Sequence, residues 1–96
     1  MPKFKLAHIH EQGQNMLIFP LDARFGNLSN DEQSSTLAQL EMRAHAAGLA
    51  GTAVAVWQQG HNFHFIGPRP WHPFLRSINM LWVQQNVNRE LTWQDS

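Results

Sequence analysis

The sequence of 96 residues contains no cysteine, which excludes a disulfide framework, a thiolate zinc site and a cysteine nucleophile. Neither sign of charge is in surplus, because seven basic residues balance seven acidic ones. Proteins that bind duplex nucleic acid usually carry a basic surplus or stripe, so this balance does not support that class. No apolar run approaches the ~20 residues that cross a bilayer, and residues 1–14 lack the apolar segment of a secretory signal. We therefore expect a cytoplasmic protein with no membrane partner.

The sequence motifs of common enzyme classes are missing as well. There is no glycine-rich phosphate loop followed by Lys-Ser/Thr, and no serine stands in a nucleophile-elbow sequence. Ser29 has the position of a helix cap, while Ser34 and Ser35 lie inside the helix that follows. Because no nucleophile, base and orienting group can be recognised together, we expect a protein that is not an enzyme and needs no cofactor.

The chain is long enough for one hydrophobic core, and 43% of its residues are hydrophobic, so we expect residues 1–96 to form a single domain. Alternating apolar residues predict strands over about 4–10, 15–20, 52–58 and 62–66. Helical spacing predicts helices over about 30–47 and 72–86, and residues 91–96 are expected to be a partly frayed tail. The ββαββα order favours an α+β two-layer sandwich, with a four-stranded, mainly antiparallel sheet and both helices on one face.

Local signals support several of these boundaries. Ser29 and Glu32 have the spacing of a capping box, which predicts a helix start at Asn30. Gly60 supplies a tight turn between the last two predicted strands, since glycine adopts positive φ without steric cost. Pro73 suits the first position of the second helix.

The segment GPRPWHP, residues 67–73, joins the last predicted strand to the second helix and contains three prolines. Proline fixes φ and restricts the residue before it, so this elbow is expected to be stiff. Arginine beside exposed aromatic rings can stack on a base, bind a phosphate or anchor a peptide. The candidate ligand-binding residues are therefore Arg69, Trp71, His72 and Arg76. The alternative is structural: Trp71 and Phe74 close the end of the core while Arg69 is solvated.

Histidines provide a second candidate site. His8 and His10 lie on one side of a predicted strand, and His64 or His61 on another strand is a possible third metal ligand. An HxH pair without an acidic partner at diagnostic spacing is more often a polar face of a half-buried sheet, so we favour no metal.

The function that the sequence favours is a small non-enzymatic binding or regulatory module that acts through protein or peptide contacts. The alternatives are a nucleic-acid or anionic-ligand binder that uses the elbow, and a histidine-based metal protein or enzyme. Homodimerisation is a further candidate, because apolar residues stand beside the inner stripe of the second helix, formed by Phe74, Ile78, Leu81 and Trp82. These flanking residues are Met80, Val83, Val87 and Trp93.

Overall fold

The structure is a computed structural model that describes residues 3–11 and 13–92. Its strands are β1 (Lys3–Glu11), β2 (Gln14–Pro20), β3 (Thr52–Gln59), β4 (Asn62–Ile66) and β5 (Arg89–Thr92). Its helical elements are the 3₁₀ turns η1 (Ala23–Asn27) and η2 (Arg69–Trp71) and the α-helices α1 (Asn30–Ala46), α2 (His72–Ser77) and α3 (Met80–Gln85). The predicted α+β class, the first four strands and the first helix are confirmed. Among the described residues, no helix has the length and apolar character needed to cross a membrane.

The strands form one mixed sheet in the order β4-β3-β2-β1-β5. The hairpins β1–β2 and β3–β4 are antiparallel, whereas β2 and β3 run parallel, with Met16 opposite Thr52. Parallel neighbours need a crossover connection, and α1 supplies it between the end of β2 and the start of β3. The central seam of the sheet is therefore parallel and the other pairings are antiparallel. The expectation of a mainly antiparallel sheet holds in part, and the expected number of four strands is wrong.

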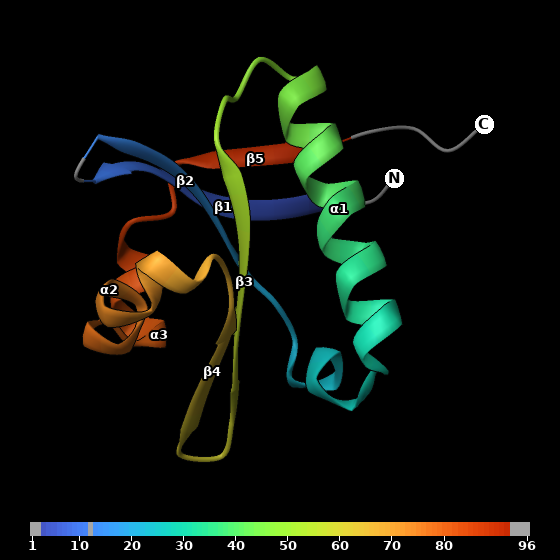
Figure 1. The fold of residues 1–96 in the computed structure, drawn as a ribbon, viewed down its shortest axis with the longest axis vertical. Coiled ribbons are helices and arrows are strands. Elements are labelled where there is room, and N and C mark those ends of the chain that lie inside the picture. Colours follow the sequence, from blue (N-terminus) through green and yellow to red (C-terminus); the bar gives the residue numbers. More distant parts are fainter. Residues whose placement is uncertain (1–2, 12, 93–96) are drawn as a thin grey trace.

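Helix α1 lies on one face of the sheet (Figure 1). The Ser29 side chain accepts a hydrogen bond from the Glu32 N–H, and the Glu32 carboxylate accepts one from the Ser29 N–H, so the predicted capping box is present. Leu40 and Ala44 turn inward against a core cluster. The sheet residues of that cluster are Leu6, Leu17, Phe19, Ala53 and Leu91.

The opposite face of the sheet is covered by α2 and α3, which Figure 1 shows on the other side from α1. Leu75 of α2 and Val83 of α3 pack there on residues that alternate with those of the first cluster. The sheet residues of this second cluster are Ala7, Met16, Ile18, Val54 and Val56. The fold therefore has three layers, and the prediction that both helices share one face of a two-layer sandwich is wrong.

The predicted helix over 72–86 is broken at Ile78 and Asn79. Ile78 is extended (φ −108°, ψ 169°), and the Asn79 side-chain oxygen accepts a hydrogen bond of 2.8 Å from the Trp82 N–H, which caps α3. The break rotates the inner face: Val83 is fully buried, whereas Leu81 is 62% exposed. The expected stripe is therefore wrong at Leu81.

The apolar patch expected for a second subunit is also not formed as predicted. Val83 belongs to the core, Met80 and Val87 are half-buried, and Trp93 lies outside the described residues. Residues 89–92 form β5 against β1, with Leu91 opposite Phe4, so the expected tail at 91–96 begins inside a strand. The prediction for residues 93–96 falls outside the described part of the chain.

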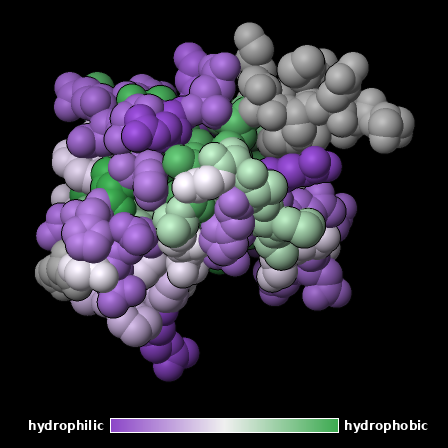
Figure 2. Space-filling model, turned by 90° about the horizontal axis from the view of Figure 1, so that it is seen from above, coloured by the Kyte–Doolittle hydropathy of each residue, from purple (hydrophilic) through white to green (hydrophobic). Residues whose placement is uncertain are grey.

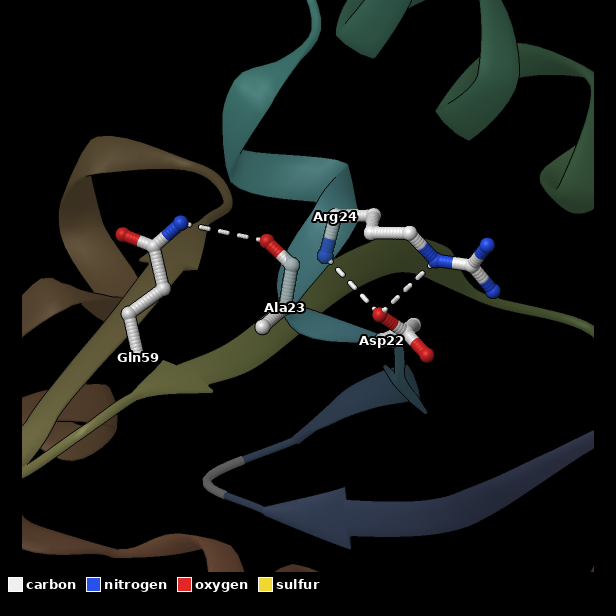
Figure 3. Close-up of polar contacts among 4 residues, drawn as sticks. All are labelled: Asp22, Ala23, Arg24 and Gln59. Carbon is white, nitrogen blue, oxygen red and sulfur yellow. Dashed lines mark hydrogen bonds and ion pairs between the residues drawn. The ribbon is translucent and has the colours of Figure 1, made fainter.

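The connection from β2 to α1 contains η1, whose N-terminal end is held by polar contacts (Figure 3). Asp22 caps the turn by accepting from the Arg24 N–H at 2.9 Å, and it also pairs with the Arg24 guanidinium at 3.3 Å. Gln59 donates to the Ala23 carbonyl at 3.1 Å and ties η1 to the end of β3. Beneath η1, Phe25 packs edge-on to Trp57 with ring centroids 5.1 Å apart.

Candidate functional site

A groove lies between the tip of the β1–β2 hairpin and the elbow that leads into α2. We call it the elbow groove; its volume is about 580 Å³, within the range of pockets that hold ligands. Glu11, Gln14 and Met16 line it from the hairpin, and Pro70, Trp71, Pro73, Phe74 and Ser77 line it from the elbow and α2. Two aromatic rings and two proline rings therefore face a hairpin tip that carries a carboxylate and an amide.

The elbow side of the groove is rigid for reasons that are local to the sequence. Pro70 and Pro73 fix φ at two positions. Pro70 lies inside η2, whose turn is closed by the Trp71 N–H donating to the Pro68 carbonyl at 2.9 Å. The Phe74 ring packs edge-on to Trp82 of α3 with centroids 5.7 Å apart. Trp71 and Phe74 are half-buried and rest on the second core cluster, so each offers one side to the groove and the other to the core.

The same turn uses the backbone N–H groups at the start of α2. The N–H groups of Trp71 and His72 already donate to the Pro68 and Arg69 carbonyls, and the two prolines have no N–H. Helix α2 is also only six residues long. Positions 70–73 therefore offer no free N–H group to an anion.

The four predicted ligand-binding residues do not converge on one point. Trp71 lines the elbow groove, but His72 turns inward, with Nε2 3.0 Å from the Gly67 carbonyl oxygen and its ring edge-on to Phe65 at 5.2 Å. Arg69 and Arg76 are exposed, lie outside the lining of the groove and have no ion-pair partner among the described residues. The segment 69–76 thus offers a fixed aromatic ring between two solvated guanidinium groups.

Residues of the hairpin tip belong to the groove although the sequence did not single them out. Glu11 is half-buried, and the described part of the chain gives its carboxylate no hydrogen-bond or ion-pair partner. Glu11 and Trp71 are 60 positions apart, and only the register of β1 against β2 and the docking of α2 on the sheet bring them to one groove. No local motif marks such a contact.

The histidines suggested as metal ligands are dispersed. His8 contacts the Ala50 carbonyl through Nε2 at 3.1 Å, and His10 contacts the Asn15 side-chain oxygen through Nδ1 at 2.8 Å. His64 of β4 stacks on Trp57 of β3. β4 is three strands away from β1, which is roughly 14 Å at the usual strand spacing. His61 lies in the β3–β4 turn. Within the described ranges no three His, Cys, Asp or Glu side chains gather as a metal site would need.

Carboxyl groups with shifted pKa values lie away from the elbow groove. The backbone N–H of Arg24, and then its guanidinium, lower the pKa of Asp22 (Figure 3). Hydrogen bonds from the Ser29 backbone and then its hydroxyl lower the pKa of Glu32. Both shifts have a structural cause, because each carboxylate caps a helical turn.

A second hollow of about 780 Å³ lies beside α3 at another part of the same sheet face and is more open to solvent. Lys5 of β1 stands opposite Glu90 of β5 there, and Asp22, which pairs with Arg24, also lines it. A third hollow lies at the end of α1, lined by His45, Leu49 and Ala50 among others. Figure 2 views the molecule from this end and shows a hydrophobic strip between hydrophilic surfaces. Neither hollow has the paired aromatic rings of the elbow groove.

Comparison with known proteins gives no further guide to the site. No family model, no curated protein and no solved structure matches the chain.

Proposed function

We propose that the protein is a non-enzymatic binding module that holds a short peptide segment in the elbow groove. The observation that carries the proposal is the combination, in one groove, of two half-buried aromatic rings with the Glu11 carboxylate, which has no partner among the residues that the structure describes. Aromatic anchors that offer a flat face at little entropic cost are common at protein–protein contacts.

The groove chemistry selects the kind of peptide. Trp71, Phe74 and the two prolines favour an apolar or aromatic side chain, because such a side chain buries area against them without leaving a polar group unpaired. Glu11 favours a lysine or arginine next to that side chain, since a cation would pair with a carboxylate that has no partner among the described residues. The proposed partner is therefore a segment in which a basic residue neighbours a large apolar one.

The rigid walls support binding rather than catalysis. Proline-fixed backbone loses little conformational entropy when a partner docks, so more of the contact energy remains as affinity. Arg69 and Arg76 lie in the same segment outside the groove, where acidic residues of a longer partner can reach them.

Selection from a random dodecapeptide library displayed on phage tests the proposal. Enriched peptides should share a large apolar residue within three positions of lysine or arginine. Binding of a synthetic copy of an enriched peptide is measured by fluorescence anisotropy. The peptide should bind the Trp71→Ala variant at least tenfold more weakly than the parent. It should bind roughly two- to five-fold more weakly to Glu11→Gln, as one exposed ion pair allows. Glu90→Gln is the matched charge control outside the groove, and amide NMR spectra check that each variant is folded.

Two results would contradict the proposal. One is a selected peptide that binds the Trp71→Ala and Glu11→Gln variants as tightly as the parent. The other is selective binding of single-stranded oligonucleotides or phosphate that is lost on the double change Arg69→Ala and Arg76→Ala and falls steeply as salt is added. That second result would instead favour the anionic-ligand alternative.

A further inference from the structure

Strand β4 is an open edge of the sheet. It stands at the end of the strand order, so the half of its N–H and C=O groups that point away from β3 have no strand partner among the described residues. Its sequence, NFHFI, holds no charged residue and no proline, and its last four side chains are half-buried. Natural proteins usually blunt an exposed edge with lysine, proline or a bulge, because an open edge pairs with other strands.

The other edge of the sheet, at β5, is protected by its short length, by charged residues and by a side-chain amide. β5 is four residues long and carries Arg89 and Glu90, both exposed. Just before β5 begins, the Asn88 side chain pairs with the β1 backbone in place of a strand: it accepts from the His8 N–H at 2.9 Å and donates to the His8 carbonyl at 3.0 Å. The chain thus closes one edge with charge and a side-chain amide and leaves β4 without either device.

We propose that β4 pairs antiparallel with the β4 strand of a second copy of this chain. The strand is self-complementary when His64 stands opposite the partner's His64. In that register Phe63 lies opposite the partner's Phe65 and Phe65 opposite the partner's Phe63, so two aromatic pairs form on the sheet face that carries α2. No like charges meet, because the strand has none.

A second copy fits this edge better than an unrelated strand for two reasons. The two-fold axis through His64 makes both aromatic pairs at once, whereas an arbitrary peptide would need a matched sequence to make either. The paired sheets would also continue as one sheet of ten strands with the layers of helices in line on each face. Five residues on each side bury less area than a standard protein interface. The dissociation constant of the dimer should therefore be micromolar and not lower.

The proposal does not depend on the elbow groove, and single-cysteine variants test it directly. The chain has no native cysteine, so one introduced thiol reports one position. In the proposed register the residues at position 64 are a direct pair, about 4.5–5.5 Å apart at Cα, which a disulfide spans. The two copies of residue 62 would be offset by four residues, roughly 13 Å, beyond the reach of a disulfide. With diamide as oxidant, His64→Cys should give covalent dimer in at least tenfold higher yield than Asn62→Cys.

Sedimentation of the parent protein between 1 and 500 µM should show a reversible monomer–dimer equilibrium. His64→Lys places two like charges opposite each other and should weaken the dimer tenfold or more. His10→Lys, the same change at an exposed position of β1, should leave the dimer unchanged. Amide NMR spectra verify that both variants are folded. A monomer at 500 µM, a dimer that persists in His64→Lys, or equal crosslinking at positions 62 and 64 would each overturn the proposal.

Discussion

The parallel seam between β2 and β3 can be tested at Gly51, the residue before β3. Its φ is +138°, and a Cβ at this position would lie 2.7 Å from the backbone carbonyl oxygen of Asn15. Gly51 stands beside Asn15 because the next residues along the two strands, Met16 and Thr52, are paired. An alanine here would therefore meet two separate costs, a disfavoured backbone conformation and a clash with a neighbouring strand that cannot move aside like a flexible side chain.

The two costs can be separated with Gly48, which ends α1. Gly48 also has a positive φ, +86°, but a Cβ there would have no heavy atom within 4 Å. We expect Gly48→Ala to lower the free energy of unfolding by about 1–2 kcal/mol, the cost of a left-handed conformation for a residue with a Cβ. Gly51→Ala adds overpacking of about 1–3 kcal/mol and should lose about 2–5 kcal/mol in total.

Urea unfolding followed by circular dichroism measures both losses, and the melting temperature should fall by roughly 4–8 °C for each kcal/mol in a domain of this size. Equal losses in the two variants would refute the reasoning. They would mean that Gly51 does not lie against Asn15 and that β2 and β3 do not meet in the described register.

Three further outcomes are expected. Leu75 is fully buried on the α2 face, so Leu75→Ala should lower the free energy of unfolding in urea by about 2–5 kcal/mol. Leu81 is 62% exposed, so Leu81→Ala should change it by less than about 0.5 kcal/mol. The reverse order would mean that α3 has the wrong orientation. Removing the cap of α3 by Asn79→Ala should cost about 0.5–2 kcal/mol, and no loss would argue for an unbroken helix over 72–86. Because the folded pKa of Glu32 lies below 4.5, the stabilising effect of its carboxylate is present above that pH and is lost as the pH falls through the folded pKa. The difference in unfolding free energy between the parent and Glu32→Gln should therefore narrow on acidification from pH 7 to pH 3. A constant difference would contradict the role of the capping box.

Signals confined to a few neighbouring residues predicted structure well. The Ser29 and Glu32 spacing located the start of α1, and Gly60 located the β3–β4 turn, because caps and turns depend on residues close in the chain. At Asn79 the local signal was present but ambiguous. Phe74, Ile78 and Trp82 keep a four-residue spacing across the break, so periodicity alone predicted one helix where the asparagine amide caps a second one.

Features that depend on long-range contacts were harder to predict. The sequence does contain a sign of three layers: Val54 and Val56 alternate with Ala53, Ala55 and Trp57, so β3 is apolar on both faces, as strands covered on two sides are. β5 has no such sign, because it is short and polar and pairs only through the edge of β1.

The candidate site shows the same limit. Trp71 was predicted from its own segment, whereas Glu11 reaches the groove only through the packing of α2 on the sheet. His72 stays a predicted ligand-binding residue, and its ring contacts Phe65 and the Gly67 carbonyl. The direction of a side chain on a proline-rich segment depends on turns that composition does not specify.

The arrangement of two hairpins around one parallel seam has a consequence for how the chain folds. Each hairpin closes a loop of a few residues, but Met16 and Thr52 are 36 positions apart (52 − 16), so the seam must close a loop that contains all of α1. Closing the longer loop costs more chain entropy before any contact rewards it, and non-local pairing slows folding. We expect the hairpins to form early and their union to limit the rate. In stopped-flow refolding, Ala53→Gly in β3 and Gln59→Gly beside the tight turn should then both slow folding, because the seam and the turn are both formed in the rate-limiting step. If Ala53→Gly mainly speeds unfolding instead, the seam forms after that step and the reasoning is wrong.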